Sequence, residues 1–537
     1  MSTPLPQDRA APRYRRLAHL PRQLLRKNPF AGTLNPVRVP LLSLTSGRPT
    51  LPFPHPWNYR TPLRILDTFF WNADADAGPG RHTRYLDVPG FAPVLVTRDP
   101  SLIRAISTQT GDQPGMFDRD TLPSSGIARA TGEDTLLYAN GPAWKRQKKL
   151  ATPPFARTTL FQPEQFREFA GTFRQTVRTR LERVREKVHA TGGPVRVQLE
   201  PEIKALMLEM LVNNFFGAQI AYDEIRDRYV PAIDRVIEHI VRDTVLAKIG
   251  IPLSRMPAVT SSMKAHRQAK ADFEALTDAV IAQRHHACGL WKQFKSDAPD
   301  QALRSNIRVF LAGALEATTS YASWAISHLA RHPAAQQRVY DEVCSVDDYT
   351  PELLEQARYL GHVLNETLRL TPSLYFHPRR ATADTWLESS SGHTLCIPAG
   401  VHVLLDVWHA NRHEDHWGRA VTGFPADQFV PERWEAAAAQ AKGSNELLHF
   451  GFGHGPRFCP GKSLGQLEVA LVVGACVKLF TFSAPVAENP ARAGVSTKPL
   501  DGVLVDLRPQ DVPLRAPTPA STSAAPRCPF AHTQPPS

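Results

Sequence analysis

The stretch 447-LLHFGFGHGPRFCPGK-462 lies near the C-terminal end of the chain and contains a single cysteine, Cys459. Three glycines and a proline precede this cysteine, so the backbone must turn tightly there. Apolar residues then recur at helical spacing from Leu464 to Gly474, which predicts a helix that begins beside Cys459. The helix dipole and the unpaired N–H groups at a helix start are expected to favour the thiolate form of Cys459. Glycine at 461 allows a flat ring to approach the backbone, and Arg457 offers a cation for a carboxylate. The stretch therefore indicates a thiolate held beneath a heme iron.

A pattern of six residues at fixed spacing within this stretch resembles the heme-binding loop of the cytochromes P450. The matching residues are Phe452, Gly453, Gly455, Arg457, Cys459 and Gly461. The resemblance implies heme b with Cys459 as the axial ligand of the iron, and Phe452, Gly455, Arg457 and Gly461 as heme contacts. It also implies the fold, a single large, mainly α heme domain with small β-sheets. A buried structural cysteine in a glycine-rich loop is the alternative interpretation.

Composition excludes several other classes of protein. The chain has 537 residues and a net charge of +12, but its basic residues are not interleaved with an RNA-binding aromatic motif, so no nucleic-acid partner is expected. The six cysteines lack paired spacing, which predicts no disulfide framework and a reducing compartment. No apolar stretch reaches the roughly 18 residues of a transmembrane segment, and the first thirty residues lack the apolar core of a secretory signal. A soluble, cytoplasmic protein is expected.

The ends of the chain differ in composition from the part between them. Residues 1–60 form a basic arm rich in proline and arginine, for which contact with a membrane surface and a mitochondrial-type presequence are the alternatives to a surface arm. The heme domain is expected over 61–508, where the motifs of the family follow one another in order. Residues 509–537 are rich in proline, alanine and serine and are expected to be disordered.

The stretch 309-VFLAGALEATTSYASW-324 predicts the helix on the oxygen side of the heme. Gly313 lets a ligand or a plate pack against the helix, and a buried acid beside a hydroxyl can relay protons. The family pattern places Glu316 at the acid position and Ala317 where a threonine is usual, whereas a second register places Thr318 there. Either a water replaces the hydroxyl, a local bulge brings Thr318 in, or oxygen is not activated in the usual way. Glu316, Thr318 and Thr319 are the candidate catalytic residues, and back-bonding to helix carbonyls is the alternative for Thr319 and Ser320.

Other motifs of the family add contacts to the heme propionates. Trp144 and Lys148 share a helix face, with Lys148 in place of the usual arginine. Arg379 is preferred to Arg380 as the arginine of a strand that reaches a propionate. Glu366 and Arg369 can pair within a helix, and Arg433 is expected to complete a buried Glu–Arg–Arg network that fixes the core on the heme side.

Two further sets of residues are candidates for the substrate pocket and for a metal site. The residues expected to line the pocket are Met116, Phe117, Leu136, Leu137, Leu374, Tyr375 and Phe376. The loop 411–418 carries clustered histidines that suggest a metal site, although an ordinary polar loop is the preferred interpretation.

The resemblance implies a heme-thiolate monooxygenase that inserts one oxygen atom from O₂ into an apolar small-molecule substrate. No flavin or iron–sulfur signature follows the heme domain, so a separate ferredoxin or flavoprotein reductase is expected to supply the electrons. Lys145, Lys149 and Lys462 are expected to dock that acidic partner. Ala317 leaves a peroxide-driven oxygenase or an isomerase open. The pair Cys528-Pro529 leaves a non-catalytic heme sensor open.

Overall fold

The computed structural model describes most of the chain between residues 81 and 510. The described residues are 30, 34, 36–37, 63, 66–71, 81–86, 94–109, 117–119, 131–132, 135–160, 163–248, 259–283, 300–345, 356–435 and 449–510. Most of the expected arm 1–60, nearly all of the tail 509–537 and the pocket candidate Met116 lie outside these residues. The two segment boundaries therefore stay predictions.

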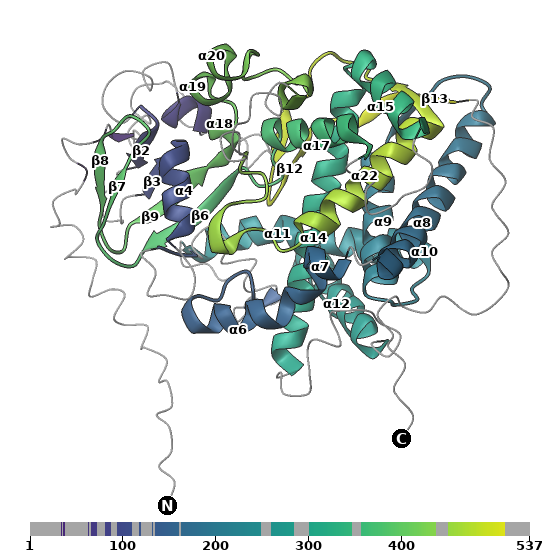
Figure 1. Cartoon of the computed structure of the whole chain (residues 1–537). Coiled ribbons are helices and arrows are strands. Elements are labelled where there is room, and N and C mark those ends of the chain that lie inside the picture. The colour runs from purple at the N-terminus through teal and green to yellow at the C-terminus, as the bar shows by residue number, and fades with distance from the viewer. Residues whose placement is uncertain are drawn as a thin grey trace, which may run out of the picture.

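Helices make up most of the described chain (Figure 1). The α-helices are α4 (Pro100–Thr108), α6 (Gly141–Ala151), α7 (Arg157–Leu160), α8 (Pro163–His189), α9 (Glu200–Glu209), α10 (Tyr222–Glu224), α11 (Val230–Lys248), α12 (Ser261–Ala282), α14 (Asp300–Leu329), α15 (Pro333–Ser345), α17 (Arg358–Leu370), α18 (Val407–Ala410), α19 (Glu414–Trp417), α20 (Arg419–Thr422) and α22 (Lys462–Leu479). Short π-helical turns are η1 (Leu66–Phe70), η4 (Met210–Phe215) and η5 (Ile225–Tyr229), and the 3₁₀ turns are η3 (Pro153–Phe155) and η8 (Gly455–Arg457).

The strands form small sheets, as expected from the sequence. They are β1 (Pro36–Val37), β2 (Thr83–Leu86), β3 (Val94–Thr97), β4 (Phe117–Arg119), β5 (Val195–Gln198), β6 (Phe376–Ala381), β7 (Thr385–Glu388), β8 (Thr394–Ile397), β9 (His402–Asp406), β10 (Phe480–Ser483), β11 (Ala491–Ala493), β12 (Thr497–Pro499) and β13 (Leu504–Pro509). The largest sheet has the order β1-β2-β3-β9-β6-β4, a second has the order β10-β13-β5, and β7-β8 and β11-β12 are hairpins.

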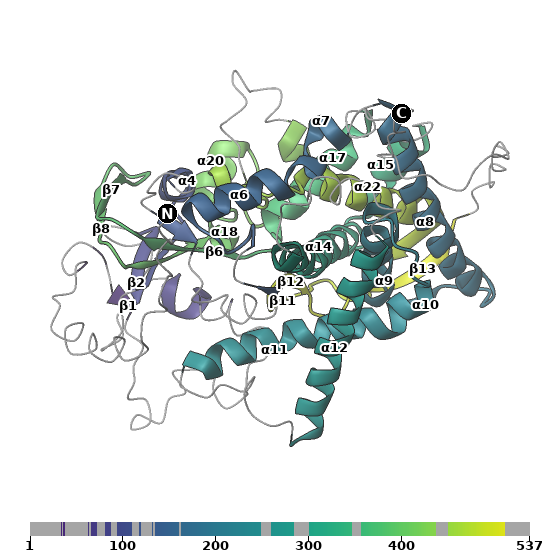
Figure 2. The ribbon, with the colours of Figure 1, turned by 90° about the horizontal axis from the view of Figure 1, so that it is seen from below.

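Two helices organise the helical side of the molecule. The long helix α14 and the helix α22, which follows the cysteine loop, contact each other and are surrounded by α8, α9, α15 and α17 (Figures 1 and 2). Leu467, Val469 and Leu471 of α22 are almost completely buried in the main hydrophobic cluster, since this helix is apolar on most of its surface. Burying such side chains stabilises the fold by roughly 1.5–3 kcal/mol each.

The six-stranded sheet lies on the other side of the molecule and packs on α4 (Figure 1). Helix α4 begins after Asp99, whose Oδ1 accepts hydrogen bonds from the N–H groups of Ser101 and Leu102, with Pro100 in the first turn. Phe117 in β4 is fully buried in the hydrophobic cluster of this sheet, so it has no surface left for a ligand, contrary to its expected place in the substrate pocket.

The pairing of β4 with β6 places two arginines side by side. The strands are antiparallel, and Arg119 lies opposite Arg379. This register brings the two side chains into one region beside the cysteine loop. No sequence motif contains both arginines.

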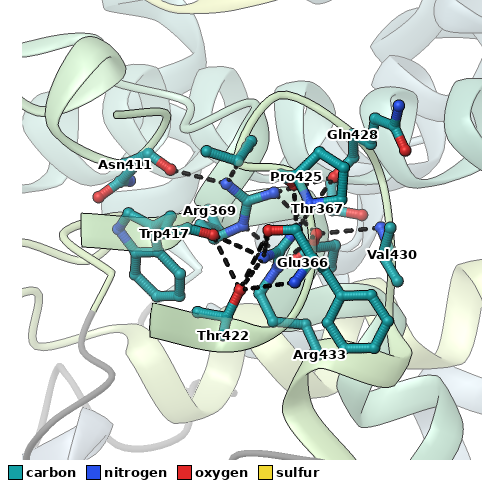
Figure 3. A network of polar contacts seen from close by, with 12 residues as sticks. Glu366, Thr367, Arg369, Asn411, Trp417, Thr422, Pro425, Gln428, Val430 and Arg433 are labelled. Carbon is teal, nitrogen blue, oxygen red and sulfur yellow. Dashed lines mark hydrogen bonds and ion pairs between the residues drawn. The ribbon is translucent and has the colours of Figure 1, made fainter. Parts of the chain in front are cut away.

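The expected Glu–Arg–Arg network is confirmed (Figure 3). Glu366, Arg369 and Arg433 are fully buried, and Arg369 forms a bidentate pair with Glu366 at 2.8 Å for both contacts. Arg433 Nε donates to Glu366 Oε1 at 3.3 Å, and the remaining N–H groups of both arginines donate to backbone carbonyls, among them Asn411 and Trp417. The charges are thus fully hydrogen-bonded, which is the condition under which a buried ion network can persist.

Candidate functional site

The cysteine loop is held by its own backbone and by the end of α4. The Cys459 N–H donates to the Phe452 carbonyl at 3.0 Å. Gly455 has φ +70°, and a Cβ atom there would lie 2.3 Å from the Ser107 carbonyl oxygen at the end of α4. A Cβ atom on Gly461 would lie 4.0 Å from Cys459 Sγ. Glycine is therefore required at 455 for the loop to approach α4. Glycine at 461 leaves the space beside the sulfur free of a side chain.

The thiol of Cys459 does not ionise as readily as the sequence suggests. Burial raises its pKa to about 11, and neither the hydrogen bond from the Gly461 backbone nor the charge of Lys462 compensates. The backbone hydrogen bond that was expected to favour the thiolate is present, but burial outweighs it. A bond from the sulfur to a metal cation deprotonates a thiol outright.

Helix α14 presents one accessible face of small residues. Gly313, Ala314, Ala317 and Thr318 are half-buried or exposed, whereas Leu315 and Glu316 between them are buried. A Cβ atom on Gly313 would meet no atom within 4 Å. The Thr318 methyl group lies 3.7 Å from where a Cβ atom on Gly465 of α22 would be, so this face turns toward the helix that carries the cysteine loop.

The helix is continuous through this region. Residues 300–329 are α-helical throughout, and the Thr318 hydroxyl donates to the Ala314 carbonyl at 2.8 Å. The bulge considered from the sequence is therefore absent from α14, and the Thr318 hydroxyl is used within the helix. The back-bond considered for Thr319 and Ser320 is not formed, since Ser320 Oγ donates to the Thr497 carbonyl at 2.6 Å. Thr319 is fully buried and lies off the accessible face, with its Oγ1 unpartnered among the described residues.

Glu316 is buried on another side of α14 and is paired with two lysines. Its carboxylate accepts from Lys204 Nζ at 2.6 Å, from Lys498 Nζ at 3.0 Å and from Ser496 Oγ at 2.9 Å. Burial by itself would raise the pKa of this carboxyl, but the charges of Lys498 and Lys204 outweigh it and hold the pKa well below its usual value. Glu316 is consequently a carboxylate near neutral pH, and it can carry a proton only after an ion pair has opened.

Three guanidinium groups whose Nε atoms are buried lie beside the cysteine loop, those of Arg119, Arg379 and Arg457. Arg379 is buried and Arg380 is exposed, which agrees with the preference for Arg379 as the arginine that reaches a propionate. Burial lowers the pKa of Arg379, and the neighbouring cations Arg119 and Arg457 lower it further. Arg119, Arg379 and Arg457 have no ion pair with a carboxylate among the described residues, and the Nε atom of each is buried without a hydrogen-bond partner. Buried cations of this kind require an anion.

Helix α6 completes this side of the site. Arg457 Nη2 donates to the Ala139 carbonyl and to Asn140 Oδ1 at 2.5 and 2.6 Å, and its guanidinium lies 4.6 Å from the centre of the Trp144 ring. Lys148 Nζ donates to the Pro456 carbonyl at 3.1 Å and lies 5.0 Å from the same ring. Both α6 residues singled out in the sequence thus contact the cysteine loop or its arginine.

The residues present fit a heme. Cys459 offers a soft ligand for iron, the small side chains of α14 leave room for a flat ring, and three unpaired guanidinium groups match the carboxylates of its propionates.

The comparison with known proteins agrees with this geometry. The family model of Cytochrome P450 matches residues 85–502, well over half of the chain. The chain belongs to the cytochrome P450 family. It is similar to the cytokinin hydroxylase of Arabidopsis thaliana, with 25% identity over 448 residues that cover 80% of this chain and 81% of the relative. It is also similar to the cytochrome P450 monooxygenase alt2 of Alternaria solani, with 25% identity over 440 residues that cover 75% of this chain and 78% of the relative.

Membership defines the general chemistry of this P450. It is a heme-thiolate monooxygenase, an oxidoreductase that uses heme b bound through a cysteine, and it works with O₂, a small-molecule substrate and a redox partner. Among the residues that the structure describes, no helix has the length and apolar character needed to cross a membrane.

Several residues that the structure places at the P450 site do not belong to any of the sequence motifs described above. Arg119, Lys204 and Lys498 come from β4, α9 and β12 and reach the site only through the fold. Lys204 gives one signal in the sequence, since it interrupts an apolar helical run, but the partner of such a lysine cannot be read from local spacing. The expected pocket residues are dispersed: Leu136 and Leu137 are half-buried, Leu374 is 42% exposed, and the Tyr375 hydroxyl donates to the Gly494 carbonyl.

Proposed function

We propose that Cys459 is the cysteine that binds the heme of this P450 and that the enzyme inserts one oxygen atom from O₂ into an apolar organic substrate. The observation that carries this proposal is the set of guanidinium groups of Arg119, Arg379 and Arg457, whose Nε atoms are buried beside the Cys459 loop and which form no ion pair with a carboxylate among the described residues. A ring with acidic substituents seated over Cys459 would supply the missing anions.

The reaction consumes O₂, two electrons and two protons, and it yields the hydroxylated substrate and water. A thiolate-ligated heme supplies the activation of O₂ when it is bound. The chain contributes the small residues Gly313, Ala314 and Ala317, which leave space for an apolar substrate against α14. Glu316 holds a negative charge beside Lys204 and Lys498, and it takes up a proton when one of these ion pairs opens.

The proposal is tested by the absorption spectrum of the reduced protein under carbon monoxide. The wild type is expected to give the red-shifted Soret band of a thiolate-ligated heme, and Cys459→Ser is expected to lose it. Cys344→Ser removes an exposed cysteine and serves as the matched control. A red-shifted band that persists in Cys459→Ser, or its absence from heme-loaded wild type, refutes the assignment.

We propose a separate ferredoxin or flavoprotein reductase as the source of electrons. This proposal is supported by the position of two positive charges. Lys145 and Lys149 are exposed on α6, the helix whose Lys148 contacts the cysteine loop. A cluster of cations beside the heme-binding loop suits an acidic electron donor.

A second candidate function, a peroxide-driven oxygenase, is favoured by the residue on the accessible face of α14. Ala317 has no hydroxyl, and the proton of the Thr318 hydroxyl is donated to the Ala314 carbonyl. With hydrogen peroxide the substrate gains one oxygen atom and water is released, so no external electrons are required. The site then needs no delivery of protons from a threonine.

The substitution Ala317→Thr separates the two candidates. If O₂ is the natural oxidant, the added hydroxyl is expected to raise O₂-dependent product formation per electron consumed by about tenfold, since positioned proton donors contribute at least that much. Ala317→Val has nearly the same shape without the hydroxyl and is the control. Product yields are measured with a reductase system and with hydrogen peroxide. Wild-type turnover with peroxide alone favours the second candidate.

A further inference from the structure

Three histidines from two distant parts of the chain meet away from the residues that contact the cysteine loop. His82 precedes β2, His413 caps the N-terminus of α19, and His416 lies within α19. The ring centres are 4.4 Å apart for His82 and His413, 5.1 Å for His82 and His416, and 5.5 Å for His413 and His416. One ring nitrogen from each residue lies within 4.8 Å of the other two.

Two of these rings have a buried nitrogen atom that makes no hydrogen bond with the described residues. His82 Nδ1 and His416 Nε2 are buried and have no hydrogen-bond partner among the described residues. A buried polar atom without a partner costs free energy, roughly 1–3 kcal/mol. A cation between the rings would satisfy both lone pairs.

The neighbouring carboxylate orients the rings for this role. His82 Nε2 accepts from Arg81 Nε at 3.1 Å and lies 3.1 Å from Asp415 Oδ2, so both polar contacts of this ring are made by Nε2 and Nδ1 is the nitrogen left for a ligand. Binding of a cation to Nδ1 requires the Nε2–H tautomer, in which Nε2 donates to Asp415 in place of accepting from Arg81. His413 Nδ1 accepts from the Asp415 N–H at 3.1 Å and lies 3.8 Å from Asp415 Oδ2. Binding of a cation to His413 Nε2 moves the ring proton to Nδ1, which breaks the hydrogen bond from the Asp415 N–H and leaves the Asp415 carboxylate as the nearby acceptor.

The charge of the surroundings is mixed. Arg81 pairs with Asp415 and donates from Nε to His82 Nε2 at 3.1 Å, while Arg98 and Arg104 are two further cations near the rings. The carboxylates of Asp415 and Asp99 offset them.

We propose that His82, His413 and His416 bind one divalent transition-metal ion of the zinc class, at a site that shares no residue with the proposed heme contacts. Three imidazole nitrogens suit Zn²⁺, Ni²⁺ or Cu²⁺ and not the oxygen-seeking Ca²⁺ or Mg²⁺. The fourth position is filled by water or by an external ligand. The ion joins the turn before β2 to α19, two segments more than 300 residues apart in the chain, as the separation of 333 between His82 and Asp415 illustrates.

Zinc binding to the heme-loaded, full-length protein tests this site. After removal of metals with a chelator, the protein is dialysed against increasing Zn²⁺, and the zinc bound per chain is measured by mass spectrometry. Wild type is expected to saturate at one zinc per chain at micromolar Zn²⁺. His82→Gln and His416→Gln are expected to bind more than about 100-fold more weakly, since even outer-shell changes cost 10–100-fold. His393→Gln alters an exposed histidine outside the cluster and should bind as the wild type does.

Thermal unfolding gives a second readout. Zinc should raise the unfolding midpoint of wild type and His393→Gln but not that of His416→Gln, because only binding to the native state stabilises it. The site is refuted if the cluster variants bind zinc as tightly as wild type does, or if the wild type takes up no stoichiometric zinc. If neither variant yields folded heme protein, crystals of the wild type soaked in Zn²⁺ decide by anomalous scattering at the zinc edge, where a peak among the three rings supports the site and its absence refutes it.

Discussion

The carboxylate of Glu316 is 5% exposed and is held between two lysines that come from α9 and β12. An isolated charge at this depth would be neutralised by a shift of its pKa, yet here the two cations keep it ionised. Glu316 therefore holds a stable negative charge in this chain. Its use in proton delivery depends on the opening of a lysine pair.

Removing this charge should destabilise the protein in a pH-dependent way. Glu316→Gln removes the shared partner of Lys204 and Lys498 and leaves these buried cations only Asp234 and Glu200, at an expected cost of about 3 kcal/mol at pH 7. The folded pKa of Glu316 lies below its unfolded value near 4.5, so the contribution is fully present above that pH and is lost as the pH falls through the folded pKa. Urea unfolding at pH 7 and in increasingly acidic buffer measures the difference between variant and wild type.

A surface pair provides the comparison. Arg178 and Glu182 are partly exposed and pair at 2.7 Å along α8, so Glu182→Gln should cost less than about 1 kcal/mol. Equal losses for the two variants at pH 7 would contradict the assignment of a buried, structurally important charge to Glu316.

At the scale of the elements, the cysteine loop depends on close contact with the end of α4. Gly455→Ala adds a Cβ atom 2.3 Å from the Ser107 carbonyl, in addition to the strain of an alanine at φ +70°. Gly392→Ala has the same kind of strain at φ +77° in the turn between β7 and β8, but its Cβ atom would meet nothing within 4 Å. Comparison of the two variants separates the effect of the steric contact from the effect of the backbone conformation.

We expect Gly392→Ala to cost about 1 kcal/mol and to keep its heme. Gly455→Ala should cost about 3 kcal/mol or more, because a backbone carbonyl cannot move aside as a flexible side chain can, and it should lose most of its heme. The ratio of Soret to protein absorbance reports heme content, and urea unfolding reports stability. Full heme occupancy in Gly455→Ala would show that the loop does not need this contact.

The elements that the sequence predicts are those whose signal is local. The helix after Cys459, the helix around Gly313 and the Glu366–Arg369 pair depend on spacings of a few residues, and the structure contains all of them. Arg119 could not be predicted, because only the register of β4 against β6 places it opposite Arg379. The raised pKa of the Cys459 thiol could not be predicted for a related reason, since burial comes from the surrounding fold and not from the loop itself.

At the scale of the whole molecule, the cysteine loop lies where the sheet side and the helical side meet. It contacts α4 through Gly455, it contacts α6 through Lys148 and Arg457, and it leads into α22 at the centre of the helices (Figure 1). The exposed lysines of α6 are thus placed near the proposed heme ligand, and this location allows the docking of an electron donor to be tested by charge reversal.

The double variant Lys145→Glu, Lys149→Glu should slow the reduction of the heme by an acidic [2Fe–2S] ferredoxin. The rate constant is expected to fall about tenfold or more at low ionic strength and to approach that of the wild type at high ionic strength, because the Debye length shrinks from roughly 30 Å at 0.01 M to 3 Å at 1 M. Lys264→Glu, Lys270→Glu is the matched control, since it reverses two exposed lysines on α12, and α14 lies between α12 and α6 in Figure 2. Stopped-flow absorbance under carbon monoxide measures the rate at each salt concentration. Equal slowing at low and high salt, or equal slowing in the control, would place the docking surface elsewhere, since a specific electrostatic contact depends both on where the charges lie and on how strongly salt screens them.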